Sequence, residues 1–185
     1  MAASAVVAFY LGDGRDHRGR SLSDIHAFGF YELELNHDYI QWLFPLPEPS
    51  GANASAPLLS NADIDRFQSG ESLRTRLLRS FELMLGFLGL ELADANGAVS
   101  VRRAQHFDER RQAWLHAGNH NFLRISRILR SLTLLGCSRY AAAFLECLEG
   151  IYAERPEVIG NTTIEYWRRA VTAKELTPKS RRHET

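Results

Sequence analysis

The most regular apolar pattern in the chain is ESLRTRLLRSFELMLGFL, residues 71–88. Its apolar side chains recur at spacings of three and four, and its arginines fall mostly on the other face. This spacing predicts an amphipathic helix with one face in a core, and Gly89 is a natural stop directly after it. We therefore expect a domain that is built around packed helices.

Further helical patterns lie on both sides of this one, at about 21–25, 36–44, 60–67, 107–115, 121–135, 138–153 and 162–171. Residues 1–11 are apolar and predict a first strand or a buried arm. Residues 46–60 are rich in proline and small residues and predict the main loop. Asn96 before Gly97 is a hairpin signal. The expected fold is mostly α, a single-domain irregular bundle of about six to eight helices, and the pattern also allows one small β-hairpin near 90–101.

The bulk composition bounds the class of protein. The chain has 185 residues, of which 45% are hydrophobic and 24% are charged, as in one folded domain. We expect that domain at 1–172, followed by a polar, basic and flexible tail at 173–185. Lys+Arg and Asp+Glu both number 22, so the overall charge does not indicate a nucleic-acid partner. The oligomeric state stays open.

No stretch reaches the ~18 uncharged apolar residues that a transmembrane helix needs. Cys137 and Cys147 lie ten residues apart in the same helical region, too far apart to form a disulfide, and are interpreted as buried apolar residues. Two unpaired cysteines fit a reducing compartment. These features predict a soluble, intracellular (cytoplasmic) protein.

Two segments have an unusual composition for a scaffold: NHDYIQWLFP, residues 36–45, and HAGNHNFLRI, residues 116–125. Each places Asn and His at a predicted helix start, with Asn36 as a plausible N-cap. Facing each other, the segments would form a pocket of imidazole, amide and guanidinium groups on an apolar wall, which is typical of ligand sites. The alternative is a pair of helix caps with buried histidines. The candidate ligand-binding residues are Asn36, His37, Tyr39, Gln41, Trp42, His120, Asn121, Arg124 and Arg127.

Other chemistries lack their residue patterns. There is no Gly-x-Ser-x-Gly nucleophile turn, and no glycine-rich loop ends in Gly-Lys-Ser/Thr. His116 and His120 are four apart, but Gly118 lies between them and no Glu follows the first. The sequence therefore predicts no catalytic residues, no metal site and no cofactor.

The run ELNHDYIQWLFP, residues 34–45, resembles the signature of the conserved region of the opioid growth factor receptor family. Residues 74–89 are similar to the long helix of that family, and NHNFLRISRILRSLTLLG, residues 119–136, resembles its HNNLRITRIL segment. Order and spacing agree over roughly residues 9–152, although residues 52–59 are unusually rich in alanine. The resemblance implies a helical domain that, in animal members, binds an enkephalin peptide. It also implies an intracellular protein associated with the nucleus or peripherally with its membrane.

Three functions compete. The leading hypothesis is a non-enzymatic binding domain of this type that holds a peptide or small polar ligand between 36–42 and 119–127. Tyr39 and Trp42 would give apolar contact, and Arg124 or Arg127 would pair with a carboxylate. The second is an enzyme with a His37/His120 acid-base pair and Arg124 as anion holder, which requires the imidazoles within roughly 4–8 Å. The third is a purely structural interaction domain.

Overall fold

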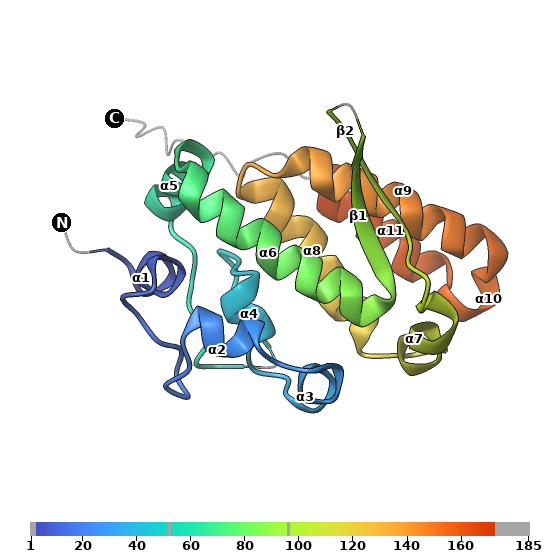
Figure 1. Ribbon diagram of the computed structural model, residues 1–185, viewed down its shortest axis with the longest axis horizontal. Coiled ribbons are helices and arrows are strands. Elements are labelled where there is room, and N and C mark those ends of the chain that lie inside the picture. The colour runs from blue at the N-terminus through green and yellow to red at the C-terminus, as the bar shows by residue number, and fades with distance from the viewer. Residues whose placement is uncertain (1–2, 52, 96, 173–185) are drawn as a thin grey trace, which may run out of the picture.

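Eleven helices and one two-stranded antiparallel sheet form the part of the chain that the structure describes, residues 3–51, 53–95 and 97–172 (Figure 1). The structure is a computed structural model. The predicted mostly α class with a small hairpin is confirmed. The tail predicted at 173–185 lies outside the described residues.

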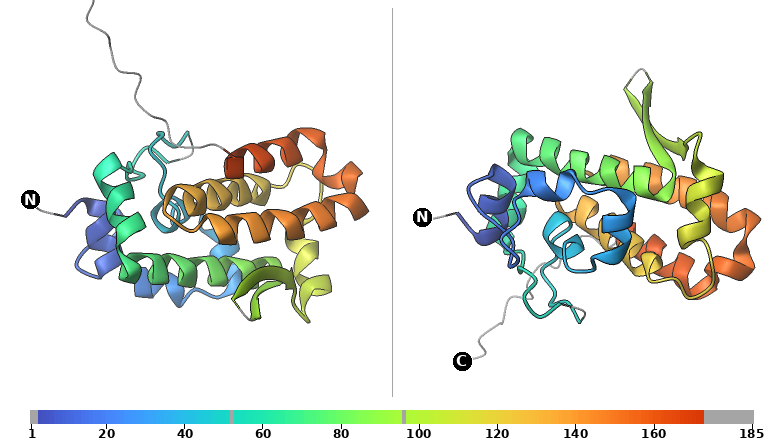
Figure 2. Two further views of the ribbon diagram at one scale, coloured as in Figure 1. Left: turned by 90° about the horizontal axis from the view of Figure 1, so that it is seen from above. Right: turned by 60° about the horizontal axis from the view of Figure 1, so that its bottom comes forward.

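The four longest helices form the core of the bundle. They are α6 (Glu71–Leu88), α8 (Asn121–Leu134), α9 (Ser138–Glu154) and α11 (Asn161–Thr172). Helices α8, α9 and α11 contact one another, and α6 runs along the side of this group that is remote from α11 (Figure 2). The predicted apolar face of α6 is buried, and each such side chain stabilises the fold by ~1.5–3 kcal/mol.

Several short elements agree with the sequence patterns. They are α2 (Leu22–His26), α5 (Asn61–Ser69), α7 (Phe107–Trp114), β1 (Leu90–Ala95) and β2 (Ala98–Arg103). Helices α2 and α5 begin with complete capping boxes at Ser21 and Ser60. The strands pair from Leu90 opposite Arg103 to Ala95 opposite Ala98, and β2 packs on α9.

Three short helices were not predicted: α1 (Ala5–Leu11), α3 (Phe30–Leu35) and α10 (Pro156–Ile159). The expectation of a strand at the N-terminus is wrong, because Ser4 caps a helix there by accepting a hydrogen bond from the Val7 amide at 3.2 Å. Short apolar runs do not distinguish strands from buried helices. The burial was foreseen correctly, since Val7 and Phe9 are fully buried.

The predicted helix start at Asn36 is also wrong. Asn36 ends α3 instead, because its backbone amide and its side-chain Nδ2 both donate to the Glu32 carbonyl, at 3.0 and 2.8 Å. The following helix, α4 (Ile40–Leu43), begins only after Tyr39 and is a single turn. Residues 36–39 therefore form a connection between two helices, and this connection faces the start of α8.

Candidate functional site

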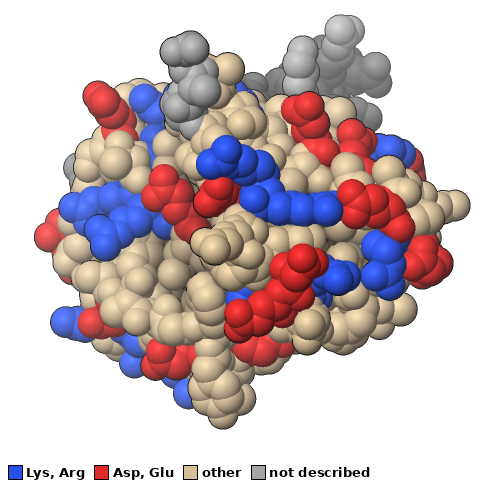
Figure 3. All heavy atoms as spheres, turned by 45° about the vertical axis from the view of Figure 1, so that its right-hand side comes forward, with Lys and Arg blue, Asp and Glu red and all other residues tan. Residues whose placement is uncertain are grey.

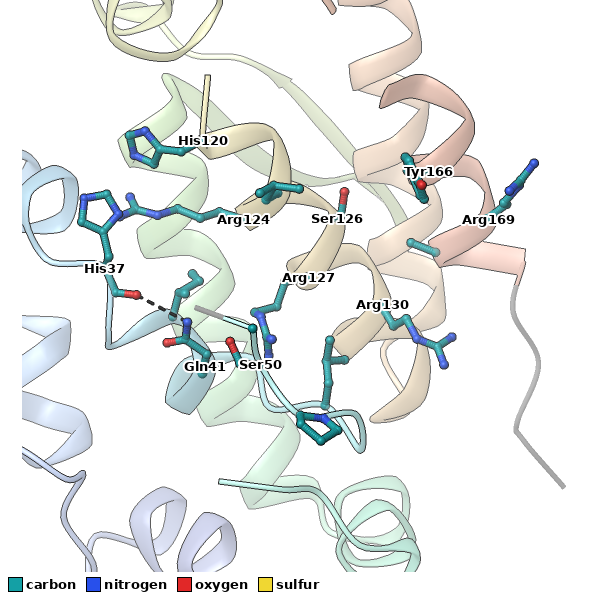
Figure 4. A pocket seen from close by; sticks show the side chains of 16 residues that line it. His37, Gln41, Ser50, His120, Arg124, Ser126, Arg127, Arg130, Tyr166 and Arg169 are labelled. Atoms are coloured by element: carbon teal, nitrogen blue, oxygen red, sulfur yellow. Dashed lines mark hydrogen bonds between the residues drawn. The ribbon is translucent and has the colours of Figure 1, made fainter. Parts of the chain in front are cut away.

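The two segments that contain Asn and His, residues 36–45 and 116–125, meet in the structure, although they are about 80 residues apart in the sequence. We call them the two Asn-His segments. The imidazole ring centroids of His37 and His120 lie 4.8 Å apart. Figure 4 shows both rings beside the Arg124 side chain, which extends from α8 toward His37. The connection between α3 and α4 is thus docked on the first turn of α8.

The Arg124 side chain joins the two segments through hydrogen bonds. Its Nη1 donates to the Leu33 carbonyl at 2.9 Å and to Asn121 Oδ1 at 3.1 Å. Its Nη2 donates to the Asn36 carbonyl at 2.8 Å and to His37 Nδ1 at 3.3 Å. The last carbonyls of a helix have no partners within that helix, so Arg124 satisfies groups that α3 leaves open. Arg124 is 5% exposed, and its donors are directed into the protein.

The two imidazoles lie in an electropositive setting. Because a guanidinium can only donate, His37 Nδ1 must accept, and the neutral ring carries its proton on Nε2. His120 Nε2 lies 3.4 Å from Glu34 Oε1 but makes no hydrogen bond with a described residue. Burial, followed by the charge of Arg124, lowers the pKa of His120, whereas Glu34 opposes that shift. His120 is therefore a neutral base at pH 7.

A groove of about 790 Å³ opens beside this junction. Helix α4 and the loop 46–51 form one wall, and α8 and α11 form the other (Figure 4). Its apolar lining consists of Ile40, Leu46, Pro49, Leu123, Tyr166 and Ala170. A second hollow of about 290 Å³ shares Tyr166 and Arg169 with it and continues along α11. The depression is therefore elongated.

The charges in the groove have one sign. Four arginines line it, Arg124, Arg127, Arg130 and Arg169, and no carboxylate is among its described lining residues. On the face of the molecule in Figure 3, by contrast, acidic and basic side chains alternate. The groove is a local cationic site on a chain whose formal net charge is zero.

The four arginines differ in how fully they are engaged. Arg130 Nη2 pairs with Glu48 Oε1 at 2.9 Å. Arg127 donates from Nη1 to the Phe44 carbonyl at 3.1 Å but has no ion pair with a described residue, and burial lowers its pKa. Arg169 is exposed, and its guanidinium has neither a hydrogen bond nor an ion pair within the described part of the chain. Arg127 and Arg169 are thus the cations with capacity for an anionic ligand.

Gln41 has an unsatisfied acceptor. The residue is 3% exposed, and its Nε2 donates to the His37 carbonyl over a long 3.4 Å. Its Oε1 is buried and has no hydrogen-bond partner among the described residues. Buried polar groups nearly always have partners, so an orphan in the wall of a groove points to a missing donor.

Five of the nine candidate residues line the groove, namely His37, Gln41, His120, Arg124 and Arg127. The other four support its walls. Tyr39 is fully buried and donates from its hydroxyl to the Leu33 carbonyl at 3.0 Å, and Asn36 ends α3. Trp42 donates to His17 Nδ1 at 3.2 Å, and Asn121 lies buried beside Arg124. The apolar contact expected from Tyr39 and Trp42 is supplied by other residues.

Leu123, Tyr166, Arg169 and the loop 46–51 complete the groove but were missed in the sequence. Leu123 and Tyr166 are 77% and 61% exposed. Two large exposed apolar residues on neighbouring helices are a signal of binding only when the helix pairing is known. Among the described residues, no cluster of three potential metal ligands exists, and no helix is long and apolar enough to cross a membrane.

Comparisons with known proteins identify the family of the chain. The family model described as the opioid growth factor receptor (OGFr) conserved region matches residues 20–183. The mouse opioid growth factor receptor is 51% identical over 111 residues, which are 60% of this chain and 17% of the mouse protein. The human receptor is 48% identical over 110 residues, 60% of this chain and 16% of the human protein.

A second group of relatives covers more of the chain. Opioid growth factor receptor-like protein 1 of Xenopus tropicalis is 40% identical over 142 residues, 75% of this chain and 27% of that protein. The match thus spans less than a third of each of these relatives. No solved structure matches significantly. Because the family model covers most of the sequence, this chain belongs to the opioid growth factor receptor conserved-region family.

Proposed function

We propose that the chain is a ligand-binding domain that holds a peptide or a small polar ligand in the groove between α4, the loop 46–51, α8 and α11. The observation that carries the proposal is the composition of the groove. It combines an apolar lining with two arginines that have no ion pair among the described residues, Arg127 and Arg169, and two buried atoms without hydrogen-bond partners, Gln41 Oε1 and His120 Nε2. Apolar walls with a few convergent polar groups are typical of ligand sites.

The shape of the groove favours a peptide over a compact molecule. Its volume of about 790 Å³ is near the upper end of small-molecule pockets, and the second hollow extends it along α11. Leu123 and Tyr166 project from its rim as exposed apolar side chains that could anchor a ligand. The names of the relatives describe them as receptors, which is consistent with a binding role. The nuclear or membrane association implied by the resemblance stays a prediction.

A synthetic library of random hexapeptides tests the proposal. The immobilised chain should enrich a subset of peptides, and Leu123→Ser should weaken the enriched peptides by about tenfold, because it removes an apolar contact worth ~1.5 kcal/mol. Tyr31→Ser is the matched control, since Tyr31 is also 77% exposed but does not line the groove. Failure to enrich any peptide, or equal binding by wild type and Leu123→Ser, would contradict the proposal.

An enzyme is the second candidate, because the His37 and His120 ring centroids, 4.8 Å apart, meet its distance requirement. With His120 as the base, the acid would have to be His37, whose Nδ1 already accepts from Arg124. A general acid must hold a proton near the working pH. Titration of ¹⁵N-labelled imidazoles by NMR decides this point. A proton held by both His37 nitrogens at pH 7 would support the enzyme, and a neutral His37 would exclude this acid-base pair.

A further inference from the structure

We infer that the groove recognises the free carboxyl end of a peptide. The backbone N–H of the last ligand residue donates to Gln41 Oε1, and its terminal carboxylate pairs with Arg127. The inference rests on the proposed function and deepens it, because it names the chemical group for which the polar atoms of the groove are arranged.

The first requirement is a donor for Gln41. An unsatisfied buried acceptor destabilises a protein, so a ligand that supplies its donor gains affinity. The amide is held only by the 3.4 Å contact from Nε2 to the His37 carbonyl. Because Oε1 is buried, a ligand reaches it only after the amide rotates about its last torsion, which is broad in glutamine, and this rotation gives up the long contact to the His37 carbonyl.

The second requirement is an anion for Arg127. Arg124 is occupied by four internal acceptors, and Arg130 is paired with Glu48. Arg127 is partly buried, has the Phe44 carbonyl as its only hydrogen-bond partner among the described residues, and forms no ion pair there, although the charge of Glu48 acts on it from a distance. Figure 4 shows the Arg127 and Gln41 side chains both extending toward the segment that carries Ser50. Both residues line the same groove, so the missing donor and the missing anion belong to one site.

Few ligand groups supply both. An interior peptide unit has an N–H but no charge, and an Asp or Glu side chain has a charge that is remote from its own N–H. The last residue of a peptide carries an N–H and a carboxylate on the same α-carbon. Its side chain would then face the apolar lining at Ile40, Leu46 and Leu123. A guanidinium suits this carboxylate, because it can donate two parallel hydrogen bonds.

Three small probes test the inference by NMR on the ¹⁵N-labelled chain. N-acetyl-L-leucine has both groups, N-acetyl-L-leucinamide lacks the carboxylate, and N-acetyl-N-methyl-L-leucine lacks the N–H. We expect the first probe to shift the amide signals of Leu123 and Ser126 and the Arg127 Nε signal. The leucinamide should bind at least about tenfold more weakly and the N-methyl probe about fivefold more weakly, as the loss of one charged and one neutral hydrogen bond predicts.

Two variants assign the effects to their residues. Arg127→Gln should abolish the preference for the acid over the amide, and Gln41→Met should abolish the preference for the N–H over the N-methyl probe. Arg102→Gln is the control, because Arg102 is paired with Glu91 on the hairpin and does not line the groove. It should leave both preferences within about twofold of wild type. If Arg127→Gln unfolds the chain, Arg127→Lys keeps the charge and should retain the preference for the acid.

Different results would contradict the inference and the proposed function. If hexapeptides from the library bind equally well with a free and an amidated carboxyl end, a peptide site exists but terminal recognition is wrong. If inorganic phosphate displaces N-acetyl-L-leucine and binds more tightly, the cationic site serves phosphate and the inference is overturned. If no peptide binds at all, the proposed function and the inference both fail.

Discussion

Replacement of Arg124 by methionine should destabilise the fold without removing a direct contact to the ligand. Methionine has a similar length but no donors, so the Asn36 carbonyl and Asn121 Oδ1 lose the guanidinium. The Leu33 carbonyl keeps the Tyr39 hydroxyl, and the exposed His37 ring regains water. Each of these two orphaned acceptors destabilises the fold by ~1–3 kcal/mol. Because the charge of arginine no longer has to be buried, the net loss in the free energy of unfolding is about 2–4 kcal/mol.

Urea denaturation followed by circular dichroism measures this loss. In a chain of this size it corresponds to a decrease in melting temperature of roughly 4–16 °C. Arg130→Met is the matched control on the same helix, and its partly exposed pair with Glu48 should contribute only about 1 kcal/mol. A stable Arg124→Met variant that no longer binds the selected peptides would refute the reasoning, because Arg124 would then act on the ligand and not on the fold.

Three further predictions concern single positions. Gly89→Ala should cost about 2 kcal/mol or more in thermal unfolding, because Gly89 has a φ of 77° and an added Cβ would lie 2.8 Å from Arg110 Cβ; an unchanged melting temperature would contradict the geometry. Trp114→Phe should lower the free energy of unfolding in urea by ~1–3 kcal/mol, since the indole donates at 2.9 Å to the buried Leu88 carbonyl at the end of α6. An unchanged free energy of unfolding would mean that water replaces the indole. Burial, followed by the charges of nearby arginines, lowers the pKa of His26 to about 4, below its usual value near 6.5. Its contribution to stability is thus present above pH 6.5 and is lost as the pH falls toward 4, and His26→Gln should flatten this part of the stability profile.

The long helices were readable from the sequence because their apolar periodicity and their stop signals agree. Helix α6 has the predicted bounds of 71–88, and α8 and α9 end within one residue of the predicted ends. Helix α3 was missed because it has six residues, leaves Tyr31 and Leu35 exposed, and has almost no apolar stripe. Its partners are Arg124 of α8, Phe87 of α6 and Arg110 of α7, which no local pattern contains.

The same limit applies to the site. The two Asn-His segments were recognised by composition, and their meeting was a testable expectation. Which of their residues would face a ligand could not be foreseen. Tyr39 and Asn36 look like ligand contacts in the sequence, but their polar atoms are used to close α3. Arg124 has its main acceptors about 90 residues away, at Leu33 and Asn36, so its structural role becomes visible only when the helices are packed.

The most direct test of a peptide groove is paramagnetic relaxation by a bound peptide. A library-selected hexapeptide with a nitroxide label at its amino end should broaden the amide signals of Leu123, Ser126 and Tyr166 in the ¹⁵N-labelled chain. It should leave Glu82 on the exposed side of α6 unaffected, and unlabelled peptide should reverse the broadening. Broadening centred on α6 or on the hairpin, with sharp signals along α8 and α11, would contradict the assignment of the groove as the ligand site.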